Sequence, residues 1–177
     1  KTSATTMMLM QLHEQGLLDL TKTVADYLPD TKGSNIAGLK LQDILTHQSG
    51  LPAWVPFYKK TLLADGTQDP GYYSQTKIAG YTTQVADNVY MRDDYRDTVW
   101  QIIKDINLKE KNKYVYSDLG LYISRRIAEQ LTGKRLDNYV YDNFYHSLGM
   151  TTTCFNPLNL FPRTQIVPTE NDTYFRY

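Results

Sequence analysis

Apolar residues recur every three or four positions in six stretches of the chain, and this spacing predicts a helix in each. The six stretches cover residues 4–12, 24–27, 41–45, 95–106, 119–131 and 136–148. Gly16, Gly133 and Gly149 follow three of them as natural helix stops. Alternating strand patterns are nearly absent. The pattern of apolar positions therefore predicts a mainly α protein.

The clearest predicted helix begins at Leu119, directly after Tyr116-Ser117-Asp118. Ser117 or Asp118 can cap it, because a short side-chain oxygen satisfies the free amides of a first helical turn. Tyr116 then lies at the mouth of the helix, where the positive end of the helix dipole favours an anion. A phenol ionises at about pH 10, so Tyr116 needs this help and a nearby cation to act as a base. The alternative is that Tyr116, one of fifteen tyrosines, only packs.

Two segments lack a sustained period. Residues 53–94 are rich in Tyr, Thr and Gln and are interrupted by glycine and proline, which predicts a long, partly ordered surface insertion. Residues 151–177 contain three prolines, which predicts an extended tail.

Composition and charge exclude several classes of function. Lysine plus arginine equals aspartate plus glutamate at 19 each, so no net field favours nucleic acid or an anionic membrane. The single cysteine, Cys154, excludes an internal disulfide and a thiolate metal cluster. The apolar run Met7–Met10 is far too short to span a bilayer. No histidine or cysteine spacing indicates a metal and no glycine-rich phosphate loop is present, so we predict no cofactor.

Three stretches, in order along the chain, carry motifs of one family. The first is Lys1 with the Met-rich helix behind it, followed by Gly-Leu-Leu-Asp-Leu at 16–20 and Tyr-Leu-Pro at 27–29. The second and most specific is Leu-Thr-His-Gln-Ser-Gly-Leu-Pro at 45–52, and the third is Tyr-Ser-Asp-Leu-Gly at 116–120. Together they resemble the serine β-lactamase and penicillin-binding protein family, in which a Ser-x-x-Lys motif opens a long helix and a Gly-x-Leu-x-Leu connector and a Tyr-Leu-Pro follow. The third stretch is similar to the Tyr-x-Asn motif of its class C members.

The resemblance implies that the chain is the helical lobe of an α/β β-lactamase/transpeptidase-like fold, with most of the antiparallel sheet missing. Residues 1–177 are then a single incomplete domain. The resemblance also implies a serine hydrolase that forms an acyl-enzyme with a β-lactam, a D-amino acid peptide or an ester. Lys1 and Tyr116 would share the general-base work, with the ammonium favouring the phenolate by direct attraction. Asp118, which stands where class C members usually have Asn, is assigned to substrate binding.

Two parts of the family's machinery are missing from the chain. If Lys1 is the motif lysine, the nucleophilic serine lies three residues before it, and the Lys/His-x-Gly motif of the edge strand lies beyond Tyr177. We therefore predict that the chain as given is catalytically inactive. It begins with lysine rather than methionine and has no signal peptide, so we expect a piece cut from a longer protein. The resemblance implies a periplasmic or extracellular location, a small-molecule or peptide substrate, and a fusion to a glycoside hydrolase as in a Bacteroidetes subgroup.

Two other functions stay open. A carboxylate cannot donate the hydrogen bond that an amide donates, so Asp118 and the Tyr-rich insertion favour a non-catalytic helical binding or interaction module derived from this family. Exposed aromatic residues, namely Trp54, Tyr72 and Tyr73, would instead suit a carbohydrate-associated accessory lobe.

Two further candidates for catalysis are set aside. Ser74-Gln75-Thr76-Lys77 also spells Ser-x-x-Lys, but no apolar helical stripe follows it to hold serine and lysine one helical turn apart. His47 follows a short predicted helix and precedes Gly50, which favours a capping or buried hydrogen bond over acid–base catalysis.

Overall fold

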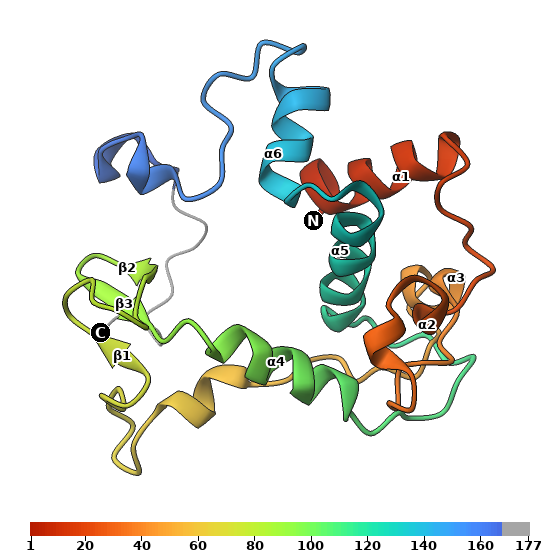
Figure 1. The fold of residues 1–177 in the computed structure, drawn as a ribbon, viewed down its shortest axis with the longest axis horizontal. Coiled ribbons are helices and arrows are strands. Elements are labelled where there is room, and N and C mark those ends of the chain that lie inside the picture. Colours follow the sequence, from red (N-terminus) through yellow and green to blue (C-terminus); the bar gives the residue numbers. More distant parts are fainter. Residues whose placement is uncertain (168–177) are drawn as a thin grey trace.

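The helix that the sequence predicts most clearly, α5 (Leu119–Thr132), lies at the centre of the helical part of the protein (Figure 1). The computed structural model describes residues 1–167. The helices packed most closely against α5 are α1 (Met7–Glu14), α2 (Val24–Tyr27), α3 (Leu41–Leu45) and α6 (Leu136–Val140). The inner face of α5 carries Ile123, Ile127 and Ala128, and all three are completely buried. Burial of these apolar side chains stabilises the packing of the surrounding helices against α5.

The remaining elements are mostly short. The remaining helix, α4 (Tyr95–Lys104), runs along the side of the molecule away from α1 and α6 (Figure 1). Single turns extend or connect the helices: π-helical turns Thr2–Thr6 and Tyr141–Tyr145, and 3₁₀ turns Pro29–Thr31, Phe57–Thr61, Pro157–Asn159 and Arg163–Gln165. The six helices that the apolar spacing predicts are all present, the last one as α6 and the π-helical turn behind it.

Both ends of α5 follow from its sequence. At its start the Ser117 hydroxyl accepts a hydrogen bond from the Leu119 amide at 3.3 Å, whereas Asp118 makes no capping hydrogen bond. Of the two predicted caps, Ser117 is therefore the one used. At the other end Gly133 has φ 66, a left-handed conformation that ends a helix at little cost for glycine.

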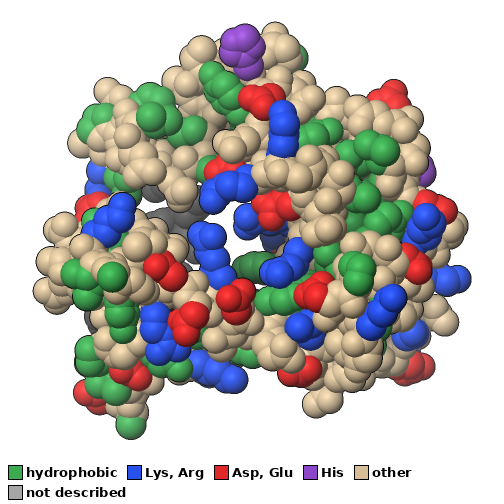
Figure 2. Space-filling model, viewed as in Figure 1, with side chains coloured by type: hydrophobic (Ala, Val, Ile, Leu, Met, Phe, Trp, Pro, Cys, Tyr) green, Lys and Arg blue, Asp and Glu red, His purple; other side chains and the backbone are tan. Residues whose placement is uncertain are grey.

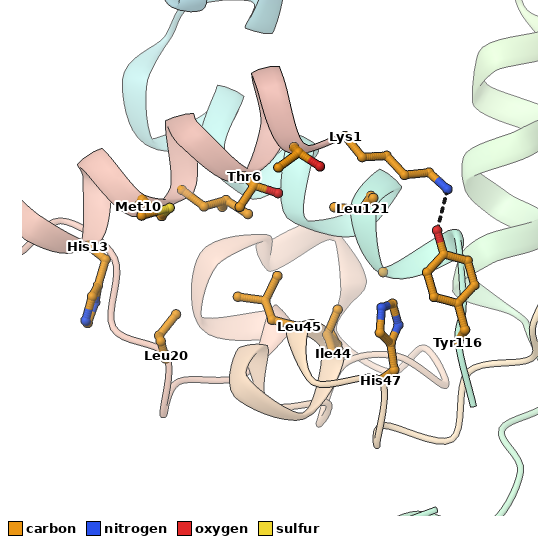
Figure 3. Close-up of a pocket in the computed structure, with 13 residues that line it drawn as sticks. Lys1, Thr6, Met10, His13, Leu20, Ile44, Leu45, His47, Tyr116 and Leu121 are labelled. Carbon is orange, nitrogen blue, oxygen red and sulfur yellow. Dashed lines mark hydrogen bonds between the residues drawn. The ribbon is translucent and has the colours of Figure 1, made fainter. Parts of the chain in front are cut away.

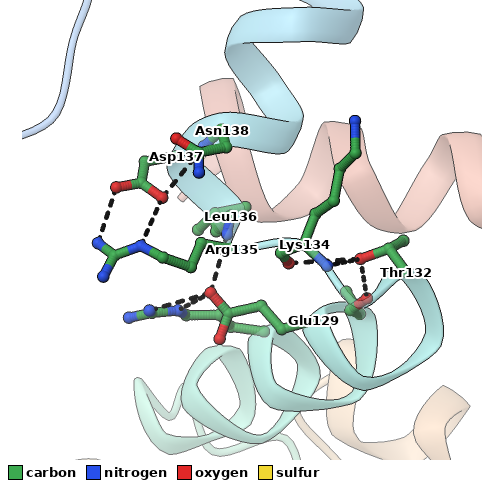
Figure 4. Close-up of polar contacts among 9 residues, drawn as sticks. Glu129, Thr132, Lys134, Arg135, Leu136, Asp137 and Asn138 are labelled. Carbon is green, nitrogen blue, oxygen red and sulfur yellow. Dashed lines mark hydrogen bonds and ion pairs between the residues drawn. The ribbon is translucent and has the colours of Figure 1, made fainter.

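Polar contacts fix the short turn from α5 to α6 (Figure 4). A Glu129 carboxylate oxygen accepts a hydrogen bond from the first amide of α6, that of Leu136, at 2.8 Å. The same oxygen accepts one from the Arg125 guanidinium at 3.0 Å. Arg135 pairs with Asp137 at 2.8 Å on the other side of the turn. Glu129 therefore supplies an acceptor that the first turn of α6 lacks within its own helix.

Residues 53–94 hold a small sheet that the alternation pattern does not predict. Its strands are β1 (Tyr73–Ser74), β2 (Thr83–Ala86) and β3 (Val89–Met91), antiparallel and in the order β1-β3-β2. Strands of two to four residues place at most two side chains on one face, too few for a recognisable period of two. The prediction of a mainly α protein therefore holds only in part: helices dominate beside a three-stranded antiparallel sheet.

The tail is partly folded into turns. Residues 151–167 include two of the 3₁₀ turns, so this part is less extended than predicted. Residues 168–177 lie outside the described part. The division into one incomplete domain, an insertion at 53–94 and a tail at 151–177 stays a prediction. Within residues 1–167, every helix falls short of the length and apolar character needed to cross a membrane.

Charged side chains of both signs lie across the face of the molecule shown in Figure 2. Lys and Arg side chains gather around a central hollow on this face, with Asp and Glu side chains among them (Figure 2). The mixture agrees with the balanced composition of 19 basic and 19 acidic residues.

Candidate active site

Two loops from distant parts of the sequence pair with each other directly before α5. One follows α3, and the other is the segment 109–118. Three backbone hydrogen bonds join them: Val115 N–H to His47 O at 2.9 Å, Asn112 N–H to Gln48 O at 3.0 Å and Lys109 N–H to Gly50 O at 2.7 Å. This pairing brings the Thr-His-Gln-Ser-Gly-Leu stretch of the sequence against the residues that lead into α5.

Gly50 is required by this close approach. It has φ 82, in the left-handed region that favours glycine. A Cβ atom added here would lie 2.5 Å from the carbonyl oxygen of Lys109, a backbone atom that cannot turn away. Gly120, in the first turn of α5, also allows a close approach, since its added Cβ would lie 2.9 Å from a methyl carbon of Ile44. The lack of a side chain at Gly50 lets the two loops approach each other, and at Gly120 it lets α5 pack against α3.

Ser117 anchors the end of the segment 109–118 to residues 52–53. Its side chain is buried, and its hydroxyl donates a hydrogen bond to the carbonyl oxygen of Pro52 at 2.7 Å. The backbone amide of Asp118 donates to Ala53 O at 3.3 Å. With Ser117 turned inward, the residues on either side of it, Tyr116 and Asp118, both reach the same cation, Lys1.

The structure brings together all three site residues predicted from the sequence: Lys1, Tyr116 and Asp118. The Lys1 ammonium donates a hydrogen bond to the Tyr116 hydroxyl at 2.6 Å across 115 positions of sequence (Figure 3). It also pairs with the Asp118 carboxylate and lies 5.1 Å from the centre of the Tyr116 ring. The turn behind Lys1 is held by Tyr145, whose hydroxyl donates to the carbonyl oxygen of Ser3 at 2.6 Å. The catalytic and binding roles of the three residues stay predictions.

Lys1 and Asp118 are both charged at neutral pH. The hydrogen bond to Asp118, and after it the one to Tyr116, raise the pKa of the Lys1 ammonium well above its usual range. The hydrogen bond from Lys1 holds the pKa of Asp118 below its usual range. The Lys1 side chain is 50% exposed and that of Asp118 is 37% exposed, so water and salt screen the pair. Lys1 is therefore a cation next to Tyr116 rather than a neutral amine.

His47 lies beside Tyr116 and makes a hydrogen bond, as the sequence predicts. Its Nδ1 accepts from the Ser117 amide at 3.2 Å. Its ring lies against that of Tyr116, with 4.7 Å between ring centres, and has Tyr114 at its edge at 5.8 Å. Sequence reasoning placed His47 in a hydrogen bond but not beside Tyr116, because a contact across two paired loops leaves no local signal.

A cavity of about 370 Å³ opens beside the cluster (Figure 3). Lys1, His47 and Tyr116 line one part of it, and apolar side chains of α1 and α3, such as Leu9 and Leu45, line another. It therefore offers a charged, hydrogen-bonding end next to an apolar wall, an arrangement typical of small-molecule sites. Within residues 1–167, no three His, Cys, Asp or Glu side chains lie close enough together to hold a metal ion.

The other candidates lie elsewhere. Ser74 is in strand β1, and its hydroxyl donates to the carbonyl oxygen of Thr76 at 2.7 Å, so it is not paired with a lysine on a helix. Of the aromatics proposed for sugar binding, Tyr73 hydrogen-bonds Thr61 and Tyr72 lies against other side chains. Trp54 is exposed and lies near the ring of Tyr58, with 6.2 Å between ring centres.

The chain is similar to known proteins along nearly its whole length. The model of the Beta-lactamase family matches residues 1–176. The N-acetylmuramyl-L-alanine amidase of Bacillus subtilis (strain 168) is 33% identical over 179 residues, which cover 96% of this chain and 35% of that protein. A protein of Escherichia coli (strain K12), provisionally described as a D-alanyl-D-alanine carboxypeptidase, is 31% identical over 96% of this chain and 36% of that protein. The chain thus spans about a third of the length of these curated relatives.

Solved structures agree at the level of the fold. A class C β-lactamase superposes with a TM-score of 0.56 and 18% identity, over 85% of this chain and 33% of that chain. The class C β-lactamase of Rhodobacter sphaeroides superposes with a TM-score of 0.50 and 23% identity, over 83% of this chain and 32% of that chain. The helices and small antiparallel sheet are therefore consistent with part of such a fold.

Proposed function

The chain belongs to the β-lactamase family, and from this premise we propose that the protein containing it is a serine hydrolase that works through an acyl-enzyme. The proposed substrate is a β-lactam, a peptide of D-amino acids or an ester. The names of the curated relatives, an amidase and a D-alanyl-D-alanine carboxypeptidase, support hydrolysis of an amide or peptide bond. In this proposal the chain is the helical lobe of the fold, and most of the antiparallel sheet lies outside it.

The hydrogen bond of 2.6 Å between Lys1 and Tyr116 is the observation that carries the proposal. Proton transfer needs a base that can reach the nucleophile, and a phenolate next to an ammonium is such a base. With a serine three residues before Lys1, serine and lysine lie one helical turn apart on one face. Because the Lys1 ammonium is bound by both Asp118 and Tyr116, we assign Lys1 as the supporting cation and Tyr116 as the base, instead of a base shared between them.

The proposed reaction has two halves. In the first, the Tyr116 phenolate takes the serine proton while the serine oxygen attacks the carbonyl carbon. The phenol then gives this proton to the leaving amine or alkoxide as the bond to the leaving group breaks. In the second half, water takes the place of serine as the attacking group, Tyr116 accepts its proton and returns it to the serine oxygen, and the acid is released. The apolar wall of the cavity suits an apolar side group of the substrate.

Asp118 favours a second candidate function, a non-catalytic binding module derived from the family. The ion pair of Asp118 occupies the Lys1 ammonium. Asp118 also places a carboxylate, which only accepts hydrogen bonds, where class C members usually have an Asn amide that can donate one. In a catalytic protein, the Asp118 carboxylate would keep its pair with Lys1 and also accept a hydrogen bond from an N–H group of the substrate. The two functions differ in whether a covalent acyl-enzyme forms at all.

The test is intact mass spectrometry of the whole protein after incubation with a penicillin and, separately, with a fluorophosphonate. We expect one covalent adduct that disappears when the serine three residues before Lys1 is replaced by alanine. Tyr116→Phe should slow adduct formation about a hundred- to ten-thousandfold, the usual contribution of positioned proton transfer. The 177-residue chain alone, which lacks that serine, should form no adduct.

Absence of any adduct from the folded whole protein would reject the hydrolase and leave the binding module. An adduct that survives replacement of that serine would show that Lys1 is not the motif lysine. The periplasmic or extracellular location and the link to a glycoside hydrolase stay predictions.

A further inference from the structure

We propose that His47 is a positioning residue that fixes the direction of the Tyr116 side chain. Its catalytic consequence rests on the proposed function, in which Tyr116 is the base. The structural claim, that His47 aims the Tyr116 hydroxyl at Lys1, stands on the contacts of His47 alone and is tested separately below.

Two hydrogen bonds anchor the backbone on both sides of Tyr116 to the same residue. The amide before it, that of Val115, donates to the carbonyl oxygen of His47 at 2.9 Å. The amide after it, that of Ser117, donates to the Nδ1 atom of His47 at 3.2 Å. The imidazole thus accepts a hydrogen bond from the amide two residues beyond Val115, in the role that a backbone carbonyl would have if the two loops continued to pair. His47 therefore holds the peptide group directly after Tyr116 and the peptide group one residue before it.

The Tyr116 side chain needs this support because its own packing is weak. Tyr116 is 48% exposed. Its ring lies against the ring of His47, with 4.7 Å between centres, and its hydroxyl accepts a hydrogen bond from the half-exposed Lys1 side chain. Burial restrains the rotamer of a half-exposed ring only in part. The anchored backbone and the neighbouring imidazole supply the restraint instead.

The backbone conformation of His47 makes the double contact possible. His47 has φ 59, in the left-handed region that few residues other than glycine, Asn, Asp and His enter readily. In this conformation it presents its carbonyl oxygen and its imidazole nitrogen to the same neighbouring segment, 115–117. Because Nδ1 accepts a hydrogen bond, the neutral ring carries its proton on Nε2.

These observations define a matched pair of variants. Asn tolerates the left-handed conformation and places its amide oxygen near the position of Nδ1, so His47→Asn keeps both the backbone and the acceptor. Glycine tolerates the conformation but has no acceptor, so His47→Gly removes only the side-chain support. In the whole protein we expect His47→Gly to lower kcat about a hundredfold with a smaller change in KM, since a displacement of about 1 Å in a base has that effect. His47→Asn should retain most of the kcat.

Nuclear magnetic resonance provides a readout that does not depend on activity. A two-bond ¹⁵N–¹⁵N coupling between the Ser117 amide and Nδ1 of His47 reports their hydrogen bond directly. A nuclear Overhauser effect between the Tyr116 ring and the Lys1 side chain reports the direction of Tyr116. We expect both signals in the wild-type protein and loss of the second in His47→Gly but not in His47→Asn.

The outcomes separate the two proposals. If the coupling is absent from the wild type, or if folded His47→Gly keeps the Tyr116–Lys1 signal and full kcat, the role assigned to His47 is wrong. If both signals behave as expected but the wild type transfers no acyl group, the proposed function fails while the structural role of His47 stands. Should His47→Gly not fold, the wild-type coupling and the kcat of His47→Asn still decide, because an Asn variant with the loss expected for glycine would contradict the acceptor role.

Discussion

The surroundings of α5 and the small sheet at residues 73–91 are stabilised in different ways. On α5, Ile123, Ile127 and Ala128 are completely buried, and helices from four other parts of the chain cover them. In the sheet no residue of the three strands is buried. It is held locally instead, through a carboxylate oxygen of Asp93 that accepts hydrogen bonds from the amides and hydroxyls of Thr82 and Thr83.

This difference has a consequence for mutations. Removing a buried group near α5 affects the free energy of unfolding of the whole molecule, because every neighbouring helix loses contacts. Removing a polar contact in the sheet opens only the sheet, because few other contacts depend on it. The backbone of the site is packed against the core around α5, as its buried Ser117 shows. The ion pair of Lys1 with Asp118 is exposed, so it resembles the local polar contacts of the sheet.

The largest expected effect is that of Ile127→Ala, in the completely buried face of α5. We expect a loss of roughly 2–5 kcal/mol in the free energy of unfolding, from lost burial and the cavity left behind. Gln130, on the exposed face of the same helix, provides the control. Gln130→Ala should change the stability by less than about 0.5 kcal/mol. Denaturant titration measures both, and similar values for the two variants would contradict the assignment of the core.

Gly50→Ala and Gly66→Ala compare the same change at the site and in a surface turn of the segment 53–94, outside the sheet. Both glycines have positive φ, 82 and 85, so alanine is strained at either position. At Gly50 the new methyl would also meet the Lys109 carbonyl oxygen at 2.5 Å, whereas nothing lies within 4 Å at Gly66. We expect losses of roughly 2–4 kcal/mol and roughly 1–2 kcal/mol, respectively. Equal losses in thermal unfolding would mean that the two loops at the site are not in close contact.

Asp93→Ala should act within the sheet. The pKa of Asp93 lies below its usual range, first because the Thr82 amide donates a hydrogen bond to it. Its contribution is therefore present above the unfolded pKa of about 3.9 and is lost as the pH falls through the lower folded pKa. We expect hydrogen exchange at the Thr82 and Thr83 amides to become faster in Asp93→Ala, with the melting temperature nearly unchanged. Asp93→Asn, which keeps an acceptor oxygen, should show a smaller effect, and unchanged exchange in both variants would contradict this role.

The smallest effect on stability is expected at the exposed ion pair. Asp118→Asn should lower the pKa of the Lys1 ammonium, since Asp118 is the first cause that raises it. Because the folded pKa is raised, the contribution of Lys1 is present below its unfolded pKa of about 10.4 and is lost as the pH rises through the folded pKa. In the variant this loss begins at a lower pH. A titration of the Lys1 side chain followed by NMR measures the shift. Tyr116→Phe removes the second cause and should lower the pKa less, so the reverse order would contradict the arrangement.

The site was open to prediction only in part. The resemblance of three stretches to a known family predicted Lys1, Tyr116 and Asp118 as site residues, and in the structure Lys1 contacts both of the others. The approach of His47 to Tyr116 could not be predicted, because it depends on how two loops some seventy positions apart pair with each other. The cavity wall could not be predicted either, since apolar residues that line a cavity and apolar residues that fill a core look alike in sequence.

By itself the sequence determined the helices around α5, their glycine ends and the apolar face that they bury. Each of these is encoded by neighbours within a few turns of one helix, so a local pattern is enough. The tertiary structure decided the three-stranded sheet, the need for glycine at position 50 and the meeting of Lys1 with Tyr116 across 115 positions. These features depend on which segments the buried core brings together, and a contact between distant segments leaves no period in the sequence of either.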